Sequence, residues 1–584
     1  MFHCFSTLSV TRRFLACVGI AALVLTGFSF PTKAETSPES KKITYVVERR
    51  SANGNSYLHI RCSFLGNTNG ITELGIPTDW ASATGAENGI KNLVVETPDA
   101  VIAPPSSRDR RQINHPKDAQ LTVTYDLVPL RKDTPSAAQA TNYLPIIQPT
   151  HFHLIGWTSW VVPFISDRSG MTASIRFEGL PRDWSVASSY GEGQTSHTFD
   201  WNLMNFGRSI VIAGDYRIHM RQIEGASAYV RFAVRGEWSF ADSLLASRAF
   251  TIIDGLRDFW SEKAANDFLV VLSPLRSDGI SSFNGTALHH AFVTFATNDV
   301  TLTKLDFLWS HEAMHAWLPQ KMGRLDEPVS KLAWFTEGFT DYYAHFLRAK
   351  WQLLSAEEFA AELNSVFRSL ATSAVRTVDN ETVAKQFHRD RQIQRLPYWR
   401  GMLLAARWDN AVRRSSEGKN TLRDVLKKIM SETAARRNLP LTRYVIEDTM
   451  KNFGVTTAAQ DIDSYIEAGR PATLEPSAFD GCFKLESASY PELQMGFDYD
   501  KAAKQQLIVG VEAQSVAYAA GLRNGQAVVA LEGRAISTEK EFSVTIRDGI
   551  AEKVITYLPA SSEKRPGQRL QIGNSEACKL FFAR

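Results

Sequence analysis

The stretch His311-Glu312-Ala313-Met314-His315 decides how the rest of the chain is interpreted. It lies in a run of helical periodicity over residues 303–317, and residues four apart in a helix share one face. Both imidazoles can therefore reach one metal ion, while Glu312 stands where it can contact a water molecule on that ion. The pattern predicts the site of a zinc hydrolase; the alternative is a helix whose histidines are merely half-buried.

A third ligand is expected because a catalytic zinc ion takes three protein ligands and keeps one position open for water. The next predicted helix, residues 331–351, contains Trp334-Phe335-Thr336-Glu337-Gly338-Phe339-Thr340-Asp341. We expect Glu337 to be the third ligand. Asp341, one turn later, is expected to accept a hydrogen bond from a ligand histidine and so to set its tautomer. The two helices predict a site for one Zn²⁺ per chain.

The sequence on either side of these helices predicts a multidomain α+β fold. Residues 35–238 hold short β-like runs, such as 43–47, 121–125 and 229–234, which are typical of a β-sandwich-like domain. Residues 239–470 are mainly helical, although apolar runs at 268–272 and 291–295 predict two strands. A capping box at Ser355-Ala356-Glu357-Glu358 predicts the start of another helix. The sequence pattern of residues 478–584 again predicts strands.

The last of these predicted domains contains Met495-Gly496-Phe497 and, further on, the text SVAYAAGLRNGQ at 515–526. It resembles a bacterial PDZ domain, in which a glycine turn presents backbone N–H groups to a C-terminal carboxylate and a strand edge pairs with the peptide. By that resemblance Met495, Gly496 and Phe497 form a loop that binds a C-terminal peptide ligand. The alternative is a PDZ-like fold that only packs on the catalytic domain.

Together, the two helices and the PDZ-like segment resemble the glycyl aminopeptidase family of gluzincin metallopeptidases. The resemblance implies a β-rich N-terminal domain, a thermolysin-like, mainly helical catalytic domain and a C-terminal PDZ-like domain. It also implies that the chain is a zinc-dependent peptidase acting on peptide or protein substrates, with Glu312 as the general base. The competing hypothesis is an exported PDZ-type peptide-binding protein on an inactive peptidase scaffold.

Tyr398, in Pro397-Tyr398-Trp399-Arg400-Gly401, is similar to the tyrosine of the YxxG helix start in this and related families. Pro397 suits the first position of a helix, so a helix over 398–414 is expected. A phenol at this place can donate to the oxyanion that develops when a peptide carbonyl is attacked. The alternative is an ordinary packed aromatic residue.

One departure from the family concerns the substrate's amino group. Related aminopeptidases carry a strand motif like GGLEH, whose glutamate binds that group, whereas this chain reads Gly285-Thr286-Ala287-Leu288-His289-His290. We expect Gly285 and His289 to line the substrate site, with His289 at the position of the glutamate. The chain is then either an aminopeptidase with altered recognition of the N-terminus or a broader peptidase; alternatively, another carboxylate binds the amine.

The first 34 residues have the three parts of a secretory signal sequence. Arg12-Arg13 precedes an apolar run over residues 14–30, and Thr32-Lys33-Ala34 offers a small residue for cleavage. The apolar run is 17 residues long, whereas a spanning helix needs about 20. We therefore expect an exported protein, periplasmic or secreted, that contacts a membrane only if the signal stays uncleaved.

Composition and cysteine content limit the remaining possibilities. The chain has 584 residues, 44% of them hydrophobic, which excludes disorder, and its 65 basic and 62 acidic residues differ only by the three basic residues of the signal. A neutral chain is a poor candidate for binding nucleic acid. After the signal, Cys62, Cys482 and Cys578 remain; Cys482 and Cys578 either form a disulfide or stay free thiols.

Overall fold

A computed structural model describes residues 42–583, except residues 82, 132–133, 137–142, 195, 263–265, 278–280, 327, 436–439, 532–537 and 550. The predicted signal sequence, residues 1–34, lies outside the described residues. Within the described residues, no helix has both the length and the apolar character that crossing a membrane requires. The fold is mixed α+β, with several sheets and helices, as predicted.

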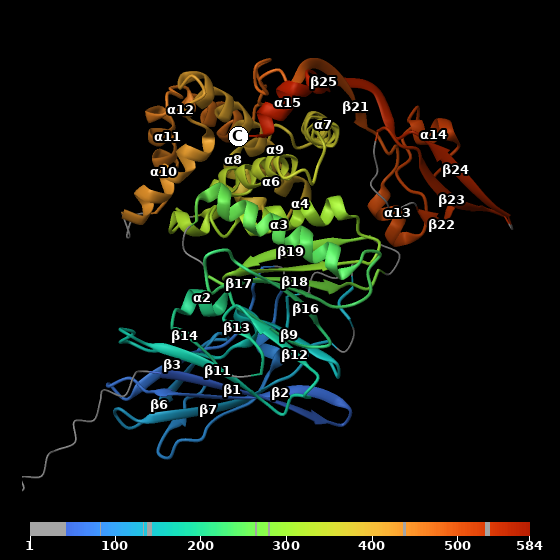
Figure 1. The fold of residues 1–584 in the computed structure, drawn as a ribbon. Coiled ribbons are helices and arrows are strands. Elements are labelled where there is room, and N and C mark those ends of the chain that lie inside the picture. The colour runs from blue at the N-terminus through green and yellow to red at the C-terminus, as the bar shows by residue number, and fades with distance from the viewer. Residues whose placement is uncertain are drawn as a thin grey trace, which may run out of the picture. The chain divides into compact units, whose positions relative to one another are not determined.

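Three β-sheets make up the N-terminal part of the structure (Figure 1). The six-stranded sheet has the order β14 (His197–Asp200), β11 (Thr172–Glu178), β1 (Lys42–Ala52), β2 (Asn55–Leu65), β7 (Gln120–Leu127) and β4 (Ile90–Val95). The four-stranded sheet has the order β10 (Val162–Phe164), β3 (Ile71–Gly75), β6 (Arg110–Asn114) and β5 (Val101–Ile102). The five-stranded sheet has the order β13 (Gly191–Glu192), β12 (Ser185–Ser188), β15 (Ile210–Gly214), β9 (His151–Ile155) and β8 (Ile146–Ile147). Short helices η1 (Ala86–Gly89), α1 (Gly156–Ser159) and α2 (Leu203–Gly207) connect them.

Alternation of apolar residues explains these strands. In β2 every second residue from Ser56 to Phe64 is buried, because successive side chains of a strand point to opposite faces. Cys62 lies on the buried face as a free thiol, and burial raises its pKa to about 12. The thiol therefore stays protonated at neutral pH and is a packing residue.

A second five-stranded sheet carries the helices of the predicted zinc site. Its order is β16 (Arg217–Gln222), β17 (Tyr229–Val234), β18 (Phe268–Pro274), β20 (Ala291–Ala296) and β19 (Phe283–Leu288). The predicted strands at 268–272 and 291–295 are confirmed. The run at 229–234 is also a strand, but it pairs in parallel with β18 and so joins this sheet. At the other edge, β19 runs antiparallel to β20.

Helices pack against this sheet and beyond it (Figure 1). Their bounds are α3 (Asp242–Trp260), α4 (Leu302–Met314), η2 (Gln320–Met322), η3 (Val329–Leu332), α5 (Ala333–Thr336), α6 (Gly338–Lys350), α7 (Ala356–Thr372), α8 (Asn380–Gln386), α9 (Arg391–Ser415), α10 (Leu422–Ala435), α11 (Arg443–Asn452), α12 (Ala458–Asp461) and η4 (Ile462–Glu467). The capping box of Ser355 and Glu358 at the start of α7 is confirmed. The predicted helix over 331–351 is instead divided into η3, α5 and α6.

The prediction that Pro397 opens its helix is wrong. Helix α9 begins six residues earlier, at Arg391, and Pro397 lies inside it. The reason is an N-cap that the sequence analysis did not consider: the Asp390 side chain accepts hydrogen bonds from the backbone N–H groups of Gln392 and Ile393. Tyr398 therefore lies in the third turn of a longer helix.

The C-terminal chain returns to the helical core. Strands β21 (Phe483–Leu493) and β25 (Ala560–Ile572) pair with each other, and α15 (Ser575–Phe582) follows. Cys482 and Cys578 form a disulfide, one of the two states that the sequence left open. Phe483, Leu570 and Phe582 are buried in the same core as the helices around the predicted zinc site. Both ends of the C-terminal segment are therefore integral to that core.

Residues 494–559 form a lobe between β21 and β25. It contains α13 (Tyr499–Gln505), α14 (Val516–Ala520) and the sheet β22 (Ala527–Leu531), β23 (Phe542–Asp548) and β24 (Ala551–Tyr557). Its apolar core is separate and includes Phe497, Ile508 and Val544. Gly496 has a φ of 74°, which favours glycine, and its carbonyl accepts hydrogen bonds from the Glu512 N–H and the Ser515 hydroxyl.

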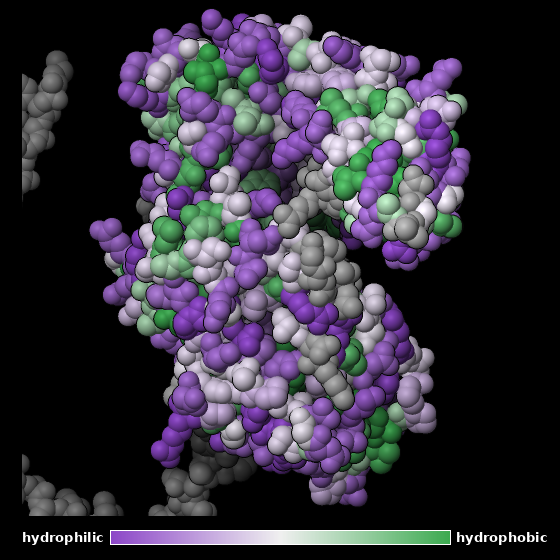
Figure 2. All heavy atoms as spheres, turned by 90° about the vertical axis from the view of Figure 1, so that its right-hand side faces the viewer, coloured by the Kyte–Doolittle hydropathy of each residue, from purple (hydrophilic) through white to green (hydrophobic). Residues whose placement is uncertain are grey.

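Exposed apolar side chains occur on this lobe. Figure 2 views the molecule from the side on which the lobe lies in Figure 1 and shows apolar surface among hydrophilic residues. Exposed apolar residues of the lobe are Leu507, Tyr518, Val529, Val554 and Leu558. An ion pair between Arg368 of α7 and Glu539 joins the lobe to the helical region.

The pairing of Leu493 with Ala560 predicts that the lobe can be removed cleanly. We expect a variant in which an Asn-Gly turn replaces residues 494–559 to unfold in one transition, with a Tm close to that of the intact chain. Truncation after residue 478 should instead prevent folding, because each buried phenylalanine lost costs about 3–5 kcal/mol. Thermal unfolding followed by circular dichroism distinguishes the two. Failure of the Asn-Gly variant to fold would show that the lobe is needed by the core.

Candidate active site

Helix α4 presents its two histidines to a single point. Thr301 caps the helix by accepting a hydrogen bond from the Lys304 N–H, and His311 and His315 lie one turn apart at its other end. Their Nε2 atoms are 3.1 Å apart. Glu337, at the junction of α5 and α6, places its Oε2 atom 3.4 Å from the Nε2 of His311 and 3.5 Å from that of His315.

The other nitrogen of each imidazole is already engaged. The Nδ1 of His311 lies 2.8 Å from Oδ1 of Asp341, and the Nδ1 of His315 lies 2.9 Å from the carbonyl oxygen of Leu318. A carboxylate and a carbonyl oxygen accept hydrogen bonds, so each Nδ1 atom is the donor. In its neutral form, each imidazole then presents an Nε2 lone pair beside the Glu337 carboxylate. Three electron-pair donors at one point fit a cation, and this donor set is one that zinc uses.

The buried imidazoles and carboxylates of this group shift one another's pKa values. Burial alone would lower the pKa of His311, but the neighbouring carboxylates of Asp341 and Glu337 raise it well above its ordinary value. Burial would raise the pKa of Glu337, but the neighbouring imidazoles of His315 and His311 lower it. Glu337 is therefore ionised at neutral pH. The group has a net preference for positive charge at its centre.

Glu312 lies on α4 and packs against the edge strand β19. Burial raises the pKa of its carboxyl, and a hydrogen bond from the Ala287 backbone opposes the shift. A Cβ atom at Gly285 would lie 3.2 Å from the Cγ of Glu312, so glycine allows this close approach. The Gly285 carbonyl accepts a hydrogen bond of 2.7 Å from the Tyr143 hydroxyl. Tyr143 comes from the N-terminal region, and no sequence signal pointed to it.

Tyr398 reaches the group from α9. Its ring lies 6.1 Å from the His311 ring, centroid to centroid, with 22° between the ring planes. Burial and the negative charge of Glu337 raise the pKa of Tyr398 well above its ordinary value. The phenol therefore keeps its proton at neutral pH and can donate it in a hydrogen bond.

Two glycines bring α6 and α9 together. Gly338 follows Glu337, and Gly401 lies one turn after Tyr398. A Cβ atom at Gly401 would lie 1.8 Å from the Trp334 carbonyl oxygen, and one at Gly338 would lie 2.5 Å from the Cα of Gly401. The backbones therefore touch close to the points where the side chains of Glu337 and Tyr398 are attached. The YxxG motif identified Gly401 in the sequence, but it did not indicate that Gly401 packs against Trp334 and Gly338.

His289 lies in the turn between β19 and β20. Its N–H donates to the Arg208 carbonyl, and its ring lies 4.1 Å from that of His290. It lines a cavity of about 200 Å³ together with Trp317 and Gln320. Burial lowers the pKa of His289 to about 3, with the charges of His290 and Arg208 acting in the same direction. The imidazole is therefore neutral at neutral pH.

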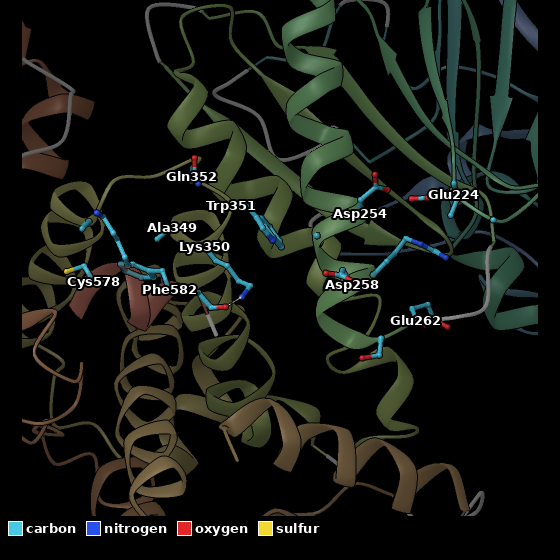
Figure 3. Close-up of a pocket in the computed structure, with 18 of the residues that line it drawn as sticks. Glu224, Asp254, Asp258, Glu262, Ala349, Lys350, Trp351, Gln352, Cys578 and Phe582 are labelled. Atoms are coloured by element: carbon cyan, nitrogen blue, oxygen red, sulfur yellow. Dashed lines mark hydrogen bonds between the residues drawn. The ribbon is translucent and has the colours of Figure 1, made fainter. Parts of the chain in front are cut away.

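A larger cavity, of about 1330 Å³, lies between α3, the end of α6 and α15 (Figure 3). Asp254 and Asp258 come from α3, Lys350 and Trp351 from the end of α6, and Phe582 from α15. None of the residues that line it is His311, His315 or Glu337. The larger cavity is therefore separate from the group formed by His311, His315 and Glu337.

Comparisons with known proteins agree with this location. Residues 305–421, which include α4, Glu337 and Tyr398, match the family model of the M61 glycyl aminopeptidases. An aminopeptidase N family protein from Idiomarina loihiensis has a similar structure, with 14% identity over 93% of this chain and 100% of that chain and a TM-score of 0.66. An M1 zinc metallopeptidase from Deinococcus radiodurans has 13% identity over 74% of this chain and 94% of that chain, with a TM-score of 0.46. No match was found among curated proteins.

The likeness to the Idiomarina protein shows a shared α+β fold. The family match adds that the segment carrying the three converging donors has the sequence character of a peptidase. Together they support a peptidase.

The close contact between Gly401 and Trp334 predicts that a single added methyl group at Gly401 lowers turnover. Gly401→Ala should lower kcat about as much as Tyr398→Phe, by roughly a hundredfold, because α9 must move away from Trp334 and take the phenol with it. Steady-state kinetics on one peptide, with metal content and Tm measured for both variants, tests this. Wild-type turnover by a folded Gly401→Ala protein would show that the contact does not position Tyr398.

Proposed function

We propose that this chain is a zinc-dependent peptidase with its active site at His311, His315 and Glu337. The observation that carries the proposal is the convergence of two Nε2 atoms and one carboxylate oxygen, with both Nδ1 atoms donating to acceptors. A bound zinc ion would polarise the substrate carbonyl and lower the pKa of a water molecule. Asp341 would keep the imidazole of His311 in the tautomer that presents Nε2.

Glu312 is proposed as the general base and acid. Its carboxylate would take the proton from the attacking water and later deliver it to the nitrogen of the leaving amine. Tyr398 would donate its phenolic proton in a hydrogen bond to the oxyanion that develops on the substrate carbonyl. The strand edge around Gly285 would hold the peptide beside Glu312. No covalent bond between chain and substrate is needed.

Three further assignments belong to this proposal. His289 would line the substrate site at the place where related aminopeptidases bind the amino group. The lobe around Met495, Gly496 and Phe497 would act as a PDZ-like domain that binds C-terminal peptide segments and selects among long substrates. Residues 1–34 would act as an export signal, placing the enzyme in the periplasm or outside the cell.

The role of Glu312 separates proton transfer from metal binding. Glu312→Gln should keep its zinc yet lower kcat by about 10²–10⁴-fold, because the residue moves protons and does not ligate the metal. His315→Ala serves as the matched control, since it should lose the metal. Metal content by mass spectrometry and turnover of a fluorogenic peptide give the two readouts. Turnover of the Glu312→Gln protein at the wild-type rate contradicts the mechanism.

A neutral His289 predicts weak recognition of a free N-terminus. A carboxylate at this position would form an ion pair with the substrate's ammonium group, whereas a neutral imidazole offers only a hydrogen bond. An N-acetylated peptide should therefore be cleaved at least as well as its free-amine counterpart, and His289→Glu should shift the preference toward free amines. Mass-spectrometric digestion of matched peptides measures this. Removal of single N-terminal residues from unblocked peptides alone would show that another carboxylate binds the amine.

A further inference from the structure

Two arginines lie on the face of α9 that leads to the proposed active site. Arg391, Arg395 and Tyr398 are spaced by four and three residues, so they share one side of the helix. The guanidinium carbon of Arg395 stands 6.0 Å from the centre of the Tyr398 ring, and that ring in turn lies against His311. The helix therefore places the charge of Arg395 beside Tyr398 and that of Arg391 one turn earlier on the same side.

Neither arginine is neutralised by the described part of the protein. Both side chains are exposed, and no described carboxylate lies within ion-pair distance of either. Asp390, the acidic residue nearest in sequence, is committed to the helix N-cap. By contrast, the buried Arg413 of the same helix pairs with Asp409 and Asp480. The charge at the start of α9 thus faces solvent beside the site.

The place proposed to receive the substrate's amino end is not negatively charged, because the imidazole of His289 there is neutral. The carboxyl groups of Glu337 and Asp341 are engaged with His311. A peptide that approaches Tyr398 along α9 therefore meets guanidinium groups, whose planar N–H donors match a carboxylate in two parallel hydrogen bonds.

We propose that Arg395, assisted by Arg391, binds a carboxylate of the substrate and makes the enzyme prefer acidic peptides. This inference rests on the proposed peptidase function and adds its substrate class. The carboxylate has two sources, an Asp or Glu side chain near the scissile bond or the free C-terminus of a short peptide. Both use the same chemistry, and matched peptides distinguish them.

The test compares kcat/KM for peptides that differ in one charge. One set carries Glu or Gln at each position around the scissile bond, all with amidated C-termini; a second set carries Gln throughout, with a free or an amidated C-terminus. The zinc-loaded full chain should cleave the charged member of at least one set about tenfold faster, a difference of about 1.4 kcal/mol. Added salt should reduce the ratio, because exposed charges are screened.

Variants assign the preference to the two side chains. Arg395→Gln should bring the ratio close to one, Arg395→Lys should retain part of it, and Arg391→Gln should lower it less. Arg182→Gln, at an exposed arginine in the loop after β11, is the matched control and should keep the wild-type ratio. If Arg395 only orients Tyr398, its loss lowers kcat for both members of a pair and leaves the ratio unchanged.

Binding measurements separate this inference from the proposed function. The zinc-loaded Glu312→Gln protein should bind the charged peptide with a Kd about tenfold lower than that of its uncharged partner, whether or not the wild type turns over. Equal Kd values, or a ratio that survives Arg395→Gln, overturn the proposal. Binding with the expected preference but without any wild-type hydrolysis would refute the peptidase function and leave the carboxylate site standing.

Discussion

The backbone contact between Gly338 and Gly401 is the constraint on which the site depends. Each glycine lies within one turn of a residue of the proposed active site, Glu337 in one segment and Tyr398 in the other. Any side chain at Gly401 would meet the Trp334 carbonyl and separate the helices. Because the two backbones touch, a carboxylate and a phenol that are 61 residues apart in the chain lie beside the same imidazole, that of His311.

The polarity of the site follows from where its protons are held. Asp341 and the Leu318 carbonyl accept hydrogen bonds from the Nδ1 atoms, so the two Nε2 atoms and Glu337 can converge on a cation as electron-pair donors. Such a group is unfavourable without a positive charge at its centre. The exposed guanidinium groups of Arg391 and Arg395 add positive charge on the Tyr398 side of α9. Substrate recognition would then depend on charge at the entrance and on hydrogen bonding at the neutral His289.

The C-terminal segment has two different structural roles. Its ends, β21, β25 and α15, complete the core around the proposed active site and are tied together by the Cys482–Cys578 disulfide. Its middle, residues 494–559, has a core of its own and is attached through one pair of neighbouring strands. In the proposed function, the lobe would influence which peptides are bound without contributing side chains to the chemistry.

Local patterns in the sequence determined the parts of the site that one helix can specify. The i, i+4 spacing of His311 and His315 and the alternation within β2 are backbone periodicities, so they could be read without knowing the fold. A local rule also misled, since Pro397 suited a helix start while Asp390 capped the helix earlier. The approach of Gly401 to Trp334, the reach of Tyr143 to Gly285 and the return of Phe582 to the helical core were decided only by the tertiary structure. They join segments far apart in the chain, and no periodicity of the sequence records which distant surfaces will meet.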